Sequence, residues 1–118
     1  MPAHEKINYL EFPVTDMDGS KRFFSQVFGW EFVDYGPDYA SFKNAGLNGG
    51  FVRSTLSAHS TTGSALTVFY SHSLEATQAK IEEAGGKLIK PIYAFPGGRR
   101  FHFTDPSGNE FAVWSHPE

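Results

Sequence analysis

The sequence predicts an α+β fold made of two βαβββ modules, in which each module is a strand, a helix and three further strands. Three observations support this prediction. A strand pattern is followed by a helical pattern, a glycine stop and three short strand patterns. The same order starts again after a polar connector. The chain has 118 residues, which is the usual size of one domain, and its 40% apolar residues are sufficient for one core.

The first module begins with a strand that is expected within residues 6–14. Leu10, Phe12 and Val14 alternate onto one face, which is the period of a strand with one buried side. Pro13 has no backbone donor, so we expect this strand to end near it or to lie at a sheet edge.

A helix is then expected between an N-cap at Asp16 and a stop at Gly29. Its apolar side chains recur at helical spacing, and they are Met17, Phe23, Phe24, Val27 and Phe28. Three short strands follow, over residues 30–35, 39–43 and 48–53. The turn segments between them are Gly36-Pro37-Asp38 and Asn44-Ala45-Gly46.

The second module repeats this order. A strand is expected over residues 65–71, and a helix over residues 74–84 with Ser73 as its N-cap and Gly85-Gly86 as its stop. Three more strands follow, over residues 87–93, 99–104 and 109–115. Their turns are Pro96-Gly97-Gly98 and Asp105-Pro106-Ser107-Gly108. The predicted boundaries within a single domain, 1–118, are 6–54 for module one, 55–64 for the connector and 65–116 for module two.

An internal duplication accounts for the repeated order. An offset of 57 residues pairs the two caps, the two helix cores and the two stops: Asp16 with Ser73, Met17 with Leu74, Phe24 with Ile81 and Gly29 with Gly86. Near the end of each module the offset becomes 62, which pairs Gly46 with Gly108, Gly50 with Ala112 and Phe51 with Val113. The larger offset is expected if the second module has a longer inner loop.

Composition excludes several classes of function. A formal net charge of −3 gives no excess positive field, so we expect no binding to nucleic acid and none to anionic membranes. The absence of cysteine excludes disulfides, thiolate nucleophiles, sulfur-ligated zinc sites and iron–sulfur sites. The N-terminal residues have no apolar signal core, and no apolar run approaches the ~20 residues of a membrane helix. The expected localisation is cytoplasmic.

Four segments carry a resemblance to a known family, and it covers nearly the whole chain. They are residues 7–16 (INYLEFPVTD), the helix end with its following strand (FF…FGWEF, from Phe23 to Phe32), Glu83-Ala84-Gly85-Gly86-Lys87 and Asp105-Pro106-Ser107-Gly108-Asn109. In this order they resemble the glyoxalase/bleomycin-resistance/dioxygenase superfamily, also called vicinal oxygen chelate proteins. The DPxGN turn before the last strand is the most specific of the four.

The resemblance implies that the two modules form a curled, cup-shaped eight-stranded mixed sheet with the two main helices outside. It also implies a homodimer that binds a small molecule inside the cup. Members of the superfamily include glyoxalase-type lyases, epimerases, ring-cleaving dioxygenases, fosfomycin-inactivating transferases and proteins that sequester drugs. Since the fold does not determine the chemistry, the function has to come from the cup residues.

The enzymes of this superfamily hold a divalent metal with His, Glu or Gln at four positions of the two modules. On the family pattern these positions fall at Tyr9, Gly50, Leu66 (or its neighbour Thr67) and Ala112. Gly, Leu and Ala have no side-chain donor, so the usual metal site is not expected to form and no cofactor is predicted. The alternative is a divalent metal at a non-standard site.

Three residues are candidates for catalysis. Glu11 and Glu110 each lie two residues from an empty metal position, so strand alternation places them on the cup face. If Phe101 and Phe103 pack toward the helices, His102 joins them there together with Arg100. A non-catalytic alternative is that Glu110 and His102 are exposed surface residues and that Glu11 forms an ion pair at the rim.

Ligand contact is predicted for Tyr9, Tyr70 and Trp114, which alternate onto the cup face, and for Arg100, which suits an anionic group. The alternative is that these aromatics pack a subunit interface or fill the cup. Gly97-Gly98-Arg99-Arg100 precedes a strand and is therefore interpreted as a hairpin with a basic rim rather than as a phosphate loop. A surface position is expected for the other histidines, which are His4, His59, His72 and His116.

We therefore predict a protein that binds a small apolar or aromatic molecule in its cup, without the usual metal. One alternative is a lyase, isomerase or dioxygenase that uses a relocated metal, or metal-free acid–base chemistry, through Glu11, Glu110 and His102. If those three donors converge on one point, this alternative gains support. A third hypothesis is an interaction module with a filled cup, in which no sizeable cavity lies between the strands.

Overall fold

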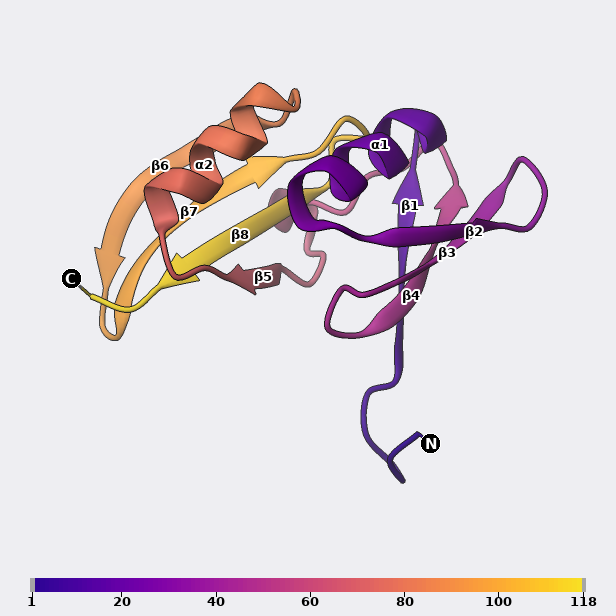
Figure 1. Cartoon of the computed structure of the whole chain (residues 1–118), viewed down its shortest axis with the longest axis horizontal. Coiled ribbons are helices and arrows are strands. Elements are labelled where there is room, and N and C mark those ends of the chain that lie inside the picture. The colour runs from indigo at the N-terminus through magenta and orange to yellow at the C-terminus, as the bar shows by residue number, and fades with distance from the viewer. Residues whose placement is uncertain (1, 118) are drawn as a thin grey trace.

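The computed structural model describes residues 2–117, and they form two βαβββ modules, each with its own four-stranded sheet (Figure 1). Module one contains β1 (Tyr9–Val14), α1 (Met17–Phe28), β2 (Glu31–Asp34), β3 (Tyr39–Lys43) and β4 (Asn48–Arg53). A 3-10 helix, η1 (Ser60–Thr62), lies in the connector. Module two contains β5 (Thr67–Tyr70), α2 (Leu74–Glu83), β6 (Lys87–Phe95), β7 (Gly98–Thr104) and β8 (Glu110–Ser115).

The two sheets have the same topology. The strand orders are β1-β4-β3-β2 and β5-β8-β7-β6, and in each sheet the first pair is parallel and the other two pairs are antiparallel. This confirms the α+β prediction of two βαβββ modules. The eight strands of the described chain are divided between two sheets rather than hydrogen-bonded into one, so the predicted single eight-stranded sheet is corrected to two. The curling into a cup stays a prediction.

The ends of α1 follow from local chemistry. The Asp16 carboxylate accepts a hydrogen bond from the Gly19 N–H at 3.0 Å, and Gly29 ends the helix in the left-handed conformation at φ 72°. Both residues were predicted. The corresponding Ser73 of α2 makes no side-chain cap; at this helix start the Ser71 hydroxyl accepts from the Ser73 N–H at 3.0 Å and donates to the Ser73 carbonyl at 2.9 Å.

The boundaries of several strands differ from the predicted ones. β1 starts at Tyr9 rather than near residue 6, and β5 is shorter than the predicted segment 65–71. β6 extends to Phe95, so that the turn before β7 is confined to two residues. Gly97 has φ 115° in this turn, a conformation that suits glycine. Pro13 lies in an edge strand, as expected.

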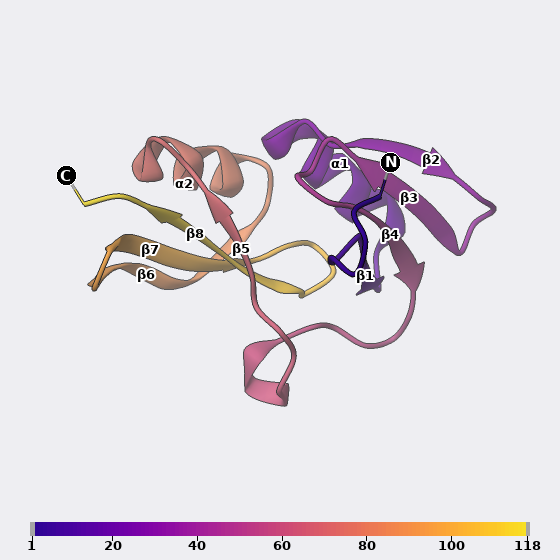
Figure 2. The ribbon, with the colours of Figure 1, turned by 90° about the horizontal axis from the view of Figure 1, so that it is seen from below.

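One core joins the two modules. Figures 1 and 2 show α1 against the first sheet and α2 against the second, with both helices on the same side of the molecule. Aromatic rings cross between the modules: Phe12 lies 5.3 Å from Phe111, and Phe28 stacks on Phe69 at 4.2 Å between ring centroids. The modules are therefore held together by buried apolar contact.

The turn between β7 and β8 provides polar contacts between the modules. The Asn109 side chain is fully buried, donates to the Pro13 carbonyl at 2.7 Å and accepts from the Ala58 N–H at 2.7 Å. The Ser107 hydroxyl accepts from the Asp16 N–H at 3.1 Å. The DPxGN turn thus connects module two to β1, to the start of α1 and to the connector. No helix within residues 2–117 is long and apolar enough to cross a membrane.

Candidate functional site

Each sheet has one face turned toward the helices and one face turned away, which we call its open face. On β7, Phe101 and Phe103 are fully buried in the core, so Arg100 and His102 alternate onto the open face, as the sequence predicted. The open face of module two comprises Val68, Tyr70, Tyr93, Phe95, Arg100, His102, Glu110, Ala112 and Trp114. Strand register aligns Tyr70, Trp114, Arg100 and Tyr93 in one cross-strand row.

His102 and Glu110 form a buried pair on this face. Each residue is 6% exposed, and His102 Nδ1 lies 2.8 Å from Glu110 Oε2. Both side chains are therefore buried, in contrast to the alternative in which Glu110 and His102 are exposed surface residues. The other oxygen, Oε1, accepts from the Ser60 N–H at 2.8 Å and lies 3.3 Å from His59 Nδ1. The connector thus folds back onto the end of β8.

The ionisation of Glu110 follows from these contacts. Partial loss of solvent raises the pKa of its carboxyl, but hydrogen bonds from Ser60 and His102 outweigh this, with a further contribution from the charge of His59. The net result is a pKa of about 2. Glu110 is therefore an anion at neutral pH, held in place by three groups of the protein.

Tyr93 and Arg100 extend the His102–Glu110 pair into a series of four hydrogen-bonded side chains. The Tyr93 hydroxyl lies 3.0 Å from His102 Nε2 and accepts from Arg100 Nε at 2.5 Å. One consistent arrangement of protons has Arg100 donating to Tyr93, Tyr93 donating to His102, and His102 donating to Glu110. Such a chain resembles the arrangement in which a carboxylate orients a histidine that can accept a proton.

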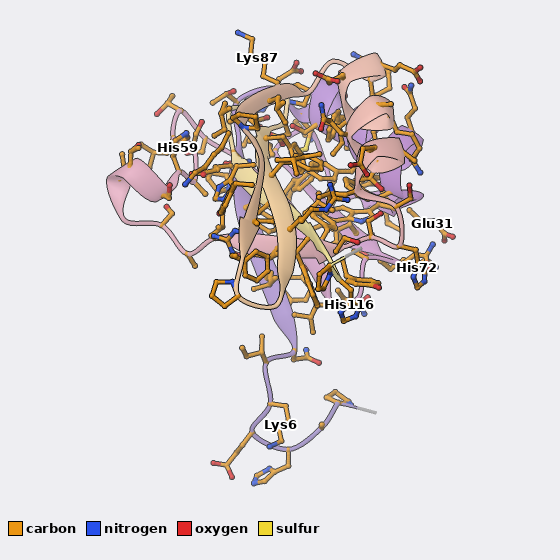
Figure 3. All side chains as sticks on the ribbon, turned by 90° about the vertical axis from the view of Figure 1, so that its left-hand side faces the viewer. Lys6, Glu31, His59, His72, Lys87 and His116 are labelled. Atoms are coloured by element: carbon orange, nitrogen blue, oxygen red, sulfur yellow. The ribbon has the colours of Figure 1, made fainter. Side chains whose placement is uncertain are left out.

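A cavity of about 360 Å³ opens beside these hydrogen-bonded side chains. It is lined by Val68, Phe95, Gly97, Arg100, Trp114 and His116. The Trp114 ring makes edge contacts with Tyr70 at 5.1 Å and with His116 at 4.9 Å between centroids. In Figure 3, His116 and His72 lie near each other at this end of module two, whereas His59 lies apart on the connector. The predicted ligand residues Tyr70, Arg100 and Trp114 thus share one aromatic region.

The open face of module one carries a separate group. Tyr9 and Tyr39 bring their hydroxyl oxygens to 2.5 Å, and the Tyr39 hydroxyl donates to Glu11 Oε2 at 2.9 Å. Partial burial and these two hydrogen bonds raise the pKa of Tyr39 well above its usual value. Glu11 is engaged with Tyr39 within module one, whereas Glu110 and His102 contact each other in module two.

The residues present do not fit the metal site of the superfamily. A side chain at Gly50 would collide with the Tyr39 hydroxyl, which occupies this space, and Ala112 is fully buried. The predicted alternative of a relocated metal held by Glu11, Glu110 and His102 is not formed either. Residues 2–117 contain no group of three or more His, Asp or Glu arranged to hold a metal ion.

A second cavity, of about 400 Å³, lies where the two modules meet. β1 contributes Leu10 and Phe12 to its wall, and β5 contributes Val68, Phe69 and Tyr70. No charged side chain lines it. Its wall is formed largely by core-facing side chains such as Phe12 and Phe69, so this cavity does not test the hypothesis of a filled cup. The cavity of about 360 Å³ on the open face of module two disagrees with that hypothesis, which predicted no sizeable cavity between the strands.

Sequence reasoning missed three participants in these groups. Tyr93 follows an irregularity in the pairing of β6 with β7, between Lys90 and Tyr93, so strand alternation could not assign its face. His59 reaches Glu110 only because the connector folds back. Tyr39 alternates onto the open face of module one and was identifiable from the period of β3 alone.

Glu110→Gln is expected to change the dependence of stability on pH. The folded-state pKa lies below the ordinary 4.5, so the carboxylate stabilises the fold above pH 4.5 and loses this effect as the pH falls toward 2. The wild type should exceed the variant by about 1–3 kcal/mol in free energy of unfolding near pH 6, and this difference should vanish near pH 2. Urea unfolding between these pH values measures it.

The stability of the wild type has to be compared with that of the variant, because the carboxyl of Asp105 gives the opposite dependence of stability on pH. Burial raises the pKa of Asp105 to about 6, so its contribution is lost as the pH rises. Glu83→Gln, at an exposed position of α2, is the control for loss of one charge and should change stability by less than about 0.5 kcal/mol. A difference between Glu110→Gln and wild type that does not vary with pH contradicts the prediction.

Comparisons with known proteins give the family. The profile of the Glyoxalase/Bleomycin resistance protein/Dioxygenase superfamily matches residues 6–113, so the chain belongs to this superfamily. A comparison with curated protein sequences gave no match.

Solved structures of the same fold include enzymes and a binding protein. A glyoxalase-related enzyme from Fulvimarina pelagi is 20% identical with a TM-score of 0.78, over 95% of this chain and 88% of that one. A variant of the fosfomycin resistance protein FosX from Listeria monocytogenes, in complex with Mn(II) and 1S,2S-dihydroxypropylphosphonic acid, is 18% identical (TM-score 0.77; 95% and 90% covered). TnmS3, an antibiotic-binding protein from Streptomyces sp. CB03234, is 20% identical (TM-score 0.68; 98% and 99% covered). At these identities the likeness shows the fold alone.

Proposed function

We propose that this chain binds a small apolar or aromatic molecule on the open face of module two. The observation that carries the proposal is the cavity of about 360 Å³ beside Trp114, which lies within the usual volume range of small-molecule sites. Three aromatic side chains line it, Phe95, Trp114 and His116, and the Tyr70 ring packs against those of Trp114 and His116. Rigid rings of this kind supply contact area at low entropic cost.

Other features agree with this proposal. The absence of donors at the usual metal positions favours binding over the metal-dependent reactions of the superfamily, and an antibiotic-binding protein shares the fold. We also propose that the protein acts as a cytoplasmic homodimer. Tyr9 lies on the open face of module one, 43% exposed, and stays a candidate for ligand contact there.

The binding proposal can be tested with 2-naphthamide, a neutral aromatic probe, by calorimetry and equilibrium dialysis. We expect saturable binding that Trp114→Ala weakens by about tenfold or more, because the ring forms a wall of the cavity. Tyr35→Ala is the matched control, since Tyr35 is a 65% exposed aromatic residue at the end of β2. Absence of saturable binding, or equal binding by the Trp114 variant, would overturn the proposal.

A second candidate function is metal-free acid–base catalysis, favoured by the hydrogen-bonded chain from Arg100 through Tyr93 and His102 to Glu110. In this function His102 accepts a proton from the bound molecule, through Tyr93 or directly, and Glu110 stabilises the cation that results. Glu11 is not part of this series of hydrogen-bonded side chains.

This candidate is tested by incubating the protein with 2-acetylnaphthalene in D2O and following loss of the methyl proton signal by NMR. We expect exchange faster than in buffer, and His102→Gln should lower the enzymatic rate by about 10²-fold. Exchange at the buffer rate, or equal exchange by the variant, would remove this candidate. The binding proposal would be unaffected, because it does not depend on proton transfer.

A further inference from the structure

We infer that the cavity beside Trp114 takes an aromatic carboxylate, with the ring against Trp114 and the carboxylate on the terminal nitrogens of Arg100. This inference rests on the proposed function, because it names the ligand class of the same site. It is carried by the position of Arg100, whose cation is partly withdrawn from water, fixed in orientation and without an acidic partner.

The charge of Arg100 has no ion-pair partner among the described residues, unlike the charges of Arg53 and Arg99. Arg53 pairs with Asp38 at 2.9 Å, and Arg99 pairs with Glu75 at 2.7 Å. Within residues 2–117, no carboxylate forms an ion pair with Arg100. The nearby anion Glu110 is engaged by His102, His59 and Ser60 instead.

A second cation reinforces this character. Lys90 Nζ lies 4.7 Å from the centre of the Tyr93 ring, and the Arg100 guanidinium carbon lies 5.6 Å from the same centre. This part of the open face therefore carries two positive groups around one tyrosine. A negatively charged ligand is attracted to such a face, whereas a cationic ligand is repelled.

The orientation of Arg100 leaves suitable donors free. Its Nε is used by the Tyr93 hydroxyl, and its guanidinium also lies 5.6 Å from the centre of the Phe95 ring. The two terminal nitrogens have no hydrogen-bond partner among the described residues. Two parallel N–H groups in one plane match the two oxygens of a carboxylate, so the side chain is prepared for bidentate contact.

The other walls of the cavity favour a ligand that contains an aromatic ring. Phe95 and Trp114 face the same space as Arg100, and Val68 and Gly97 complete its apolar wall. A neutral hydrocarbon in this space would cover the cation and leave it unpaired, which is unfavourable. A small inorganic anion would pair with the cation but would leave the aromatic walls of the cavity exposed to water. An aromatic carboxylate satisfies both parts of the cavity.

The test compares two probes of nearly equal shape, 2-naphthoate and neutral 2-naphthamide, by calorimetry on the whole chain. We expect 2-naphthoate to bind about tenfold or more tightly than the amide to the wild type. Arg100→Gln should reduce this preference to about twofold or less, because it removes the charge that distinguishes the probes. Arg53→Gln, which removes the same charge from the exposed side of module one, should keep the full preference.

Arg100→Lys provides a second variant, since it keeps the charge but loses the planar pair of donors. We expect its preference to lie between those of the wild type and the Gln variant. Near-UV circular dichroism establishes that each variant is folded.

The outcomes separate this inference from the proposed function. Equal affinity of the wild type for both probes, or an unchanged preference in the folded Arg100 variants, would overturn the inference. If 2-naphthamide still binds in a manner that depends on Trp114, the proposed function then stands. If neither probe binds, both are overturned. Inorganic phosphate that competes with 2-naphthoate as strongly as benzoate would show an anion site without ring selection and would also overturn the inference.

Discussion

We expect Phe24→Ala to lower the free energy of unfolding by about 3–5 kcal/mol. Phe24 is fully buried and contacts rings from both modules. Its ring centroid lies 4.4 Å from Trp30 in module one and 5.2 Å from Phe111 in module two. Removing the ring leaves a cavity at the centre of the shared core, which rigid neighbouring strands cannot fill. Urea unfolding followed by far-UV circular dichroism measures the effect.

Phe32→Ala is the control for this prediction. Phe32 is half-buried in β2 and packs on rings of module one, so its loss should cost clearly less than that of Phe24. We also expect both variants and the wild type to unfold in one transition, because the aromatic core crosses between modules. Two separate transitions in the wild type, or a cost below about 1.5 kcal/mol for Phe24→Ala, would contradict this account.

The second large effect is expected for Asn109→Ala, at about 2–4 kcal/mol. The Asn109 side chain bonds the Pro13 carbonyl and the Ala58 N–H, each at 2.7 Å, and is fully buried. Its removal leaves two backbone groups without partners, and each such loss costs about 1–3 kcal/mol when water cannot replace the bond. Chemical denaturation measures the change.

Two further variants sharpen this test. Asn109→Asp keeps the acceptor for Ala58 but loses the donor to Pro13, and it buries a carboxylate. We therefore expect it to be destabilised as well, and more so at pH 7 than at low pH. Asn48→Ala, at an exposed position of β4, should change stability by less than about 0.5 kcal/mol. A loss at Asn109 no larger than that at Asn48 would contradict the proposed connection between modules.

The fold could be predicted from the sequence because its main signals are local. Asp16 and Gly29 delimit α1 through contacts within a few residues, and the alternation around Phe12 and Phe101 identifies the buried faces of β1 and β7. Strand ends were less accurate, as β5 shows. The two ends of β5 depend on its pairing with β8, which is distant in the sequence, and no local pattern encodes this pairing.

The candidate site could be predicted only in part. Alternation placed His102 and Glu110 on one face, and the structure joins them by a diagonal contact across β7 and β8. The group was incomplete because Tyr93 depends on an irregular register and His59 on the path of the connector. Glu11 does not join this group, because it belongs to the other module and accepts a hydrogen bond from Tyr39.

The contact between Gly50 and Tyr39 has a consequence for how this chain could change over generations. A histidine or glutamate introduced at Gly50 would meet the Tyr39 hydroxyl before it could coordinate anything. A new side chain at Gly50 therefore requires the Tyr39 side chain to move, and Glu11 then loses the hydrogen bond from that hydroxyl. Because Leu66 and Ala112 also lack donors, a substitution at Gly50 alone does not create the metal site of the superfamily.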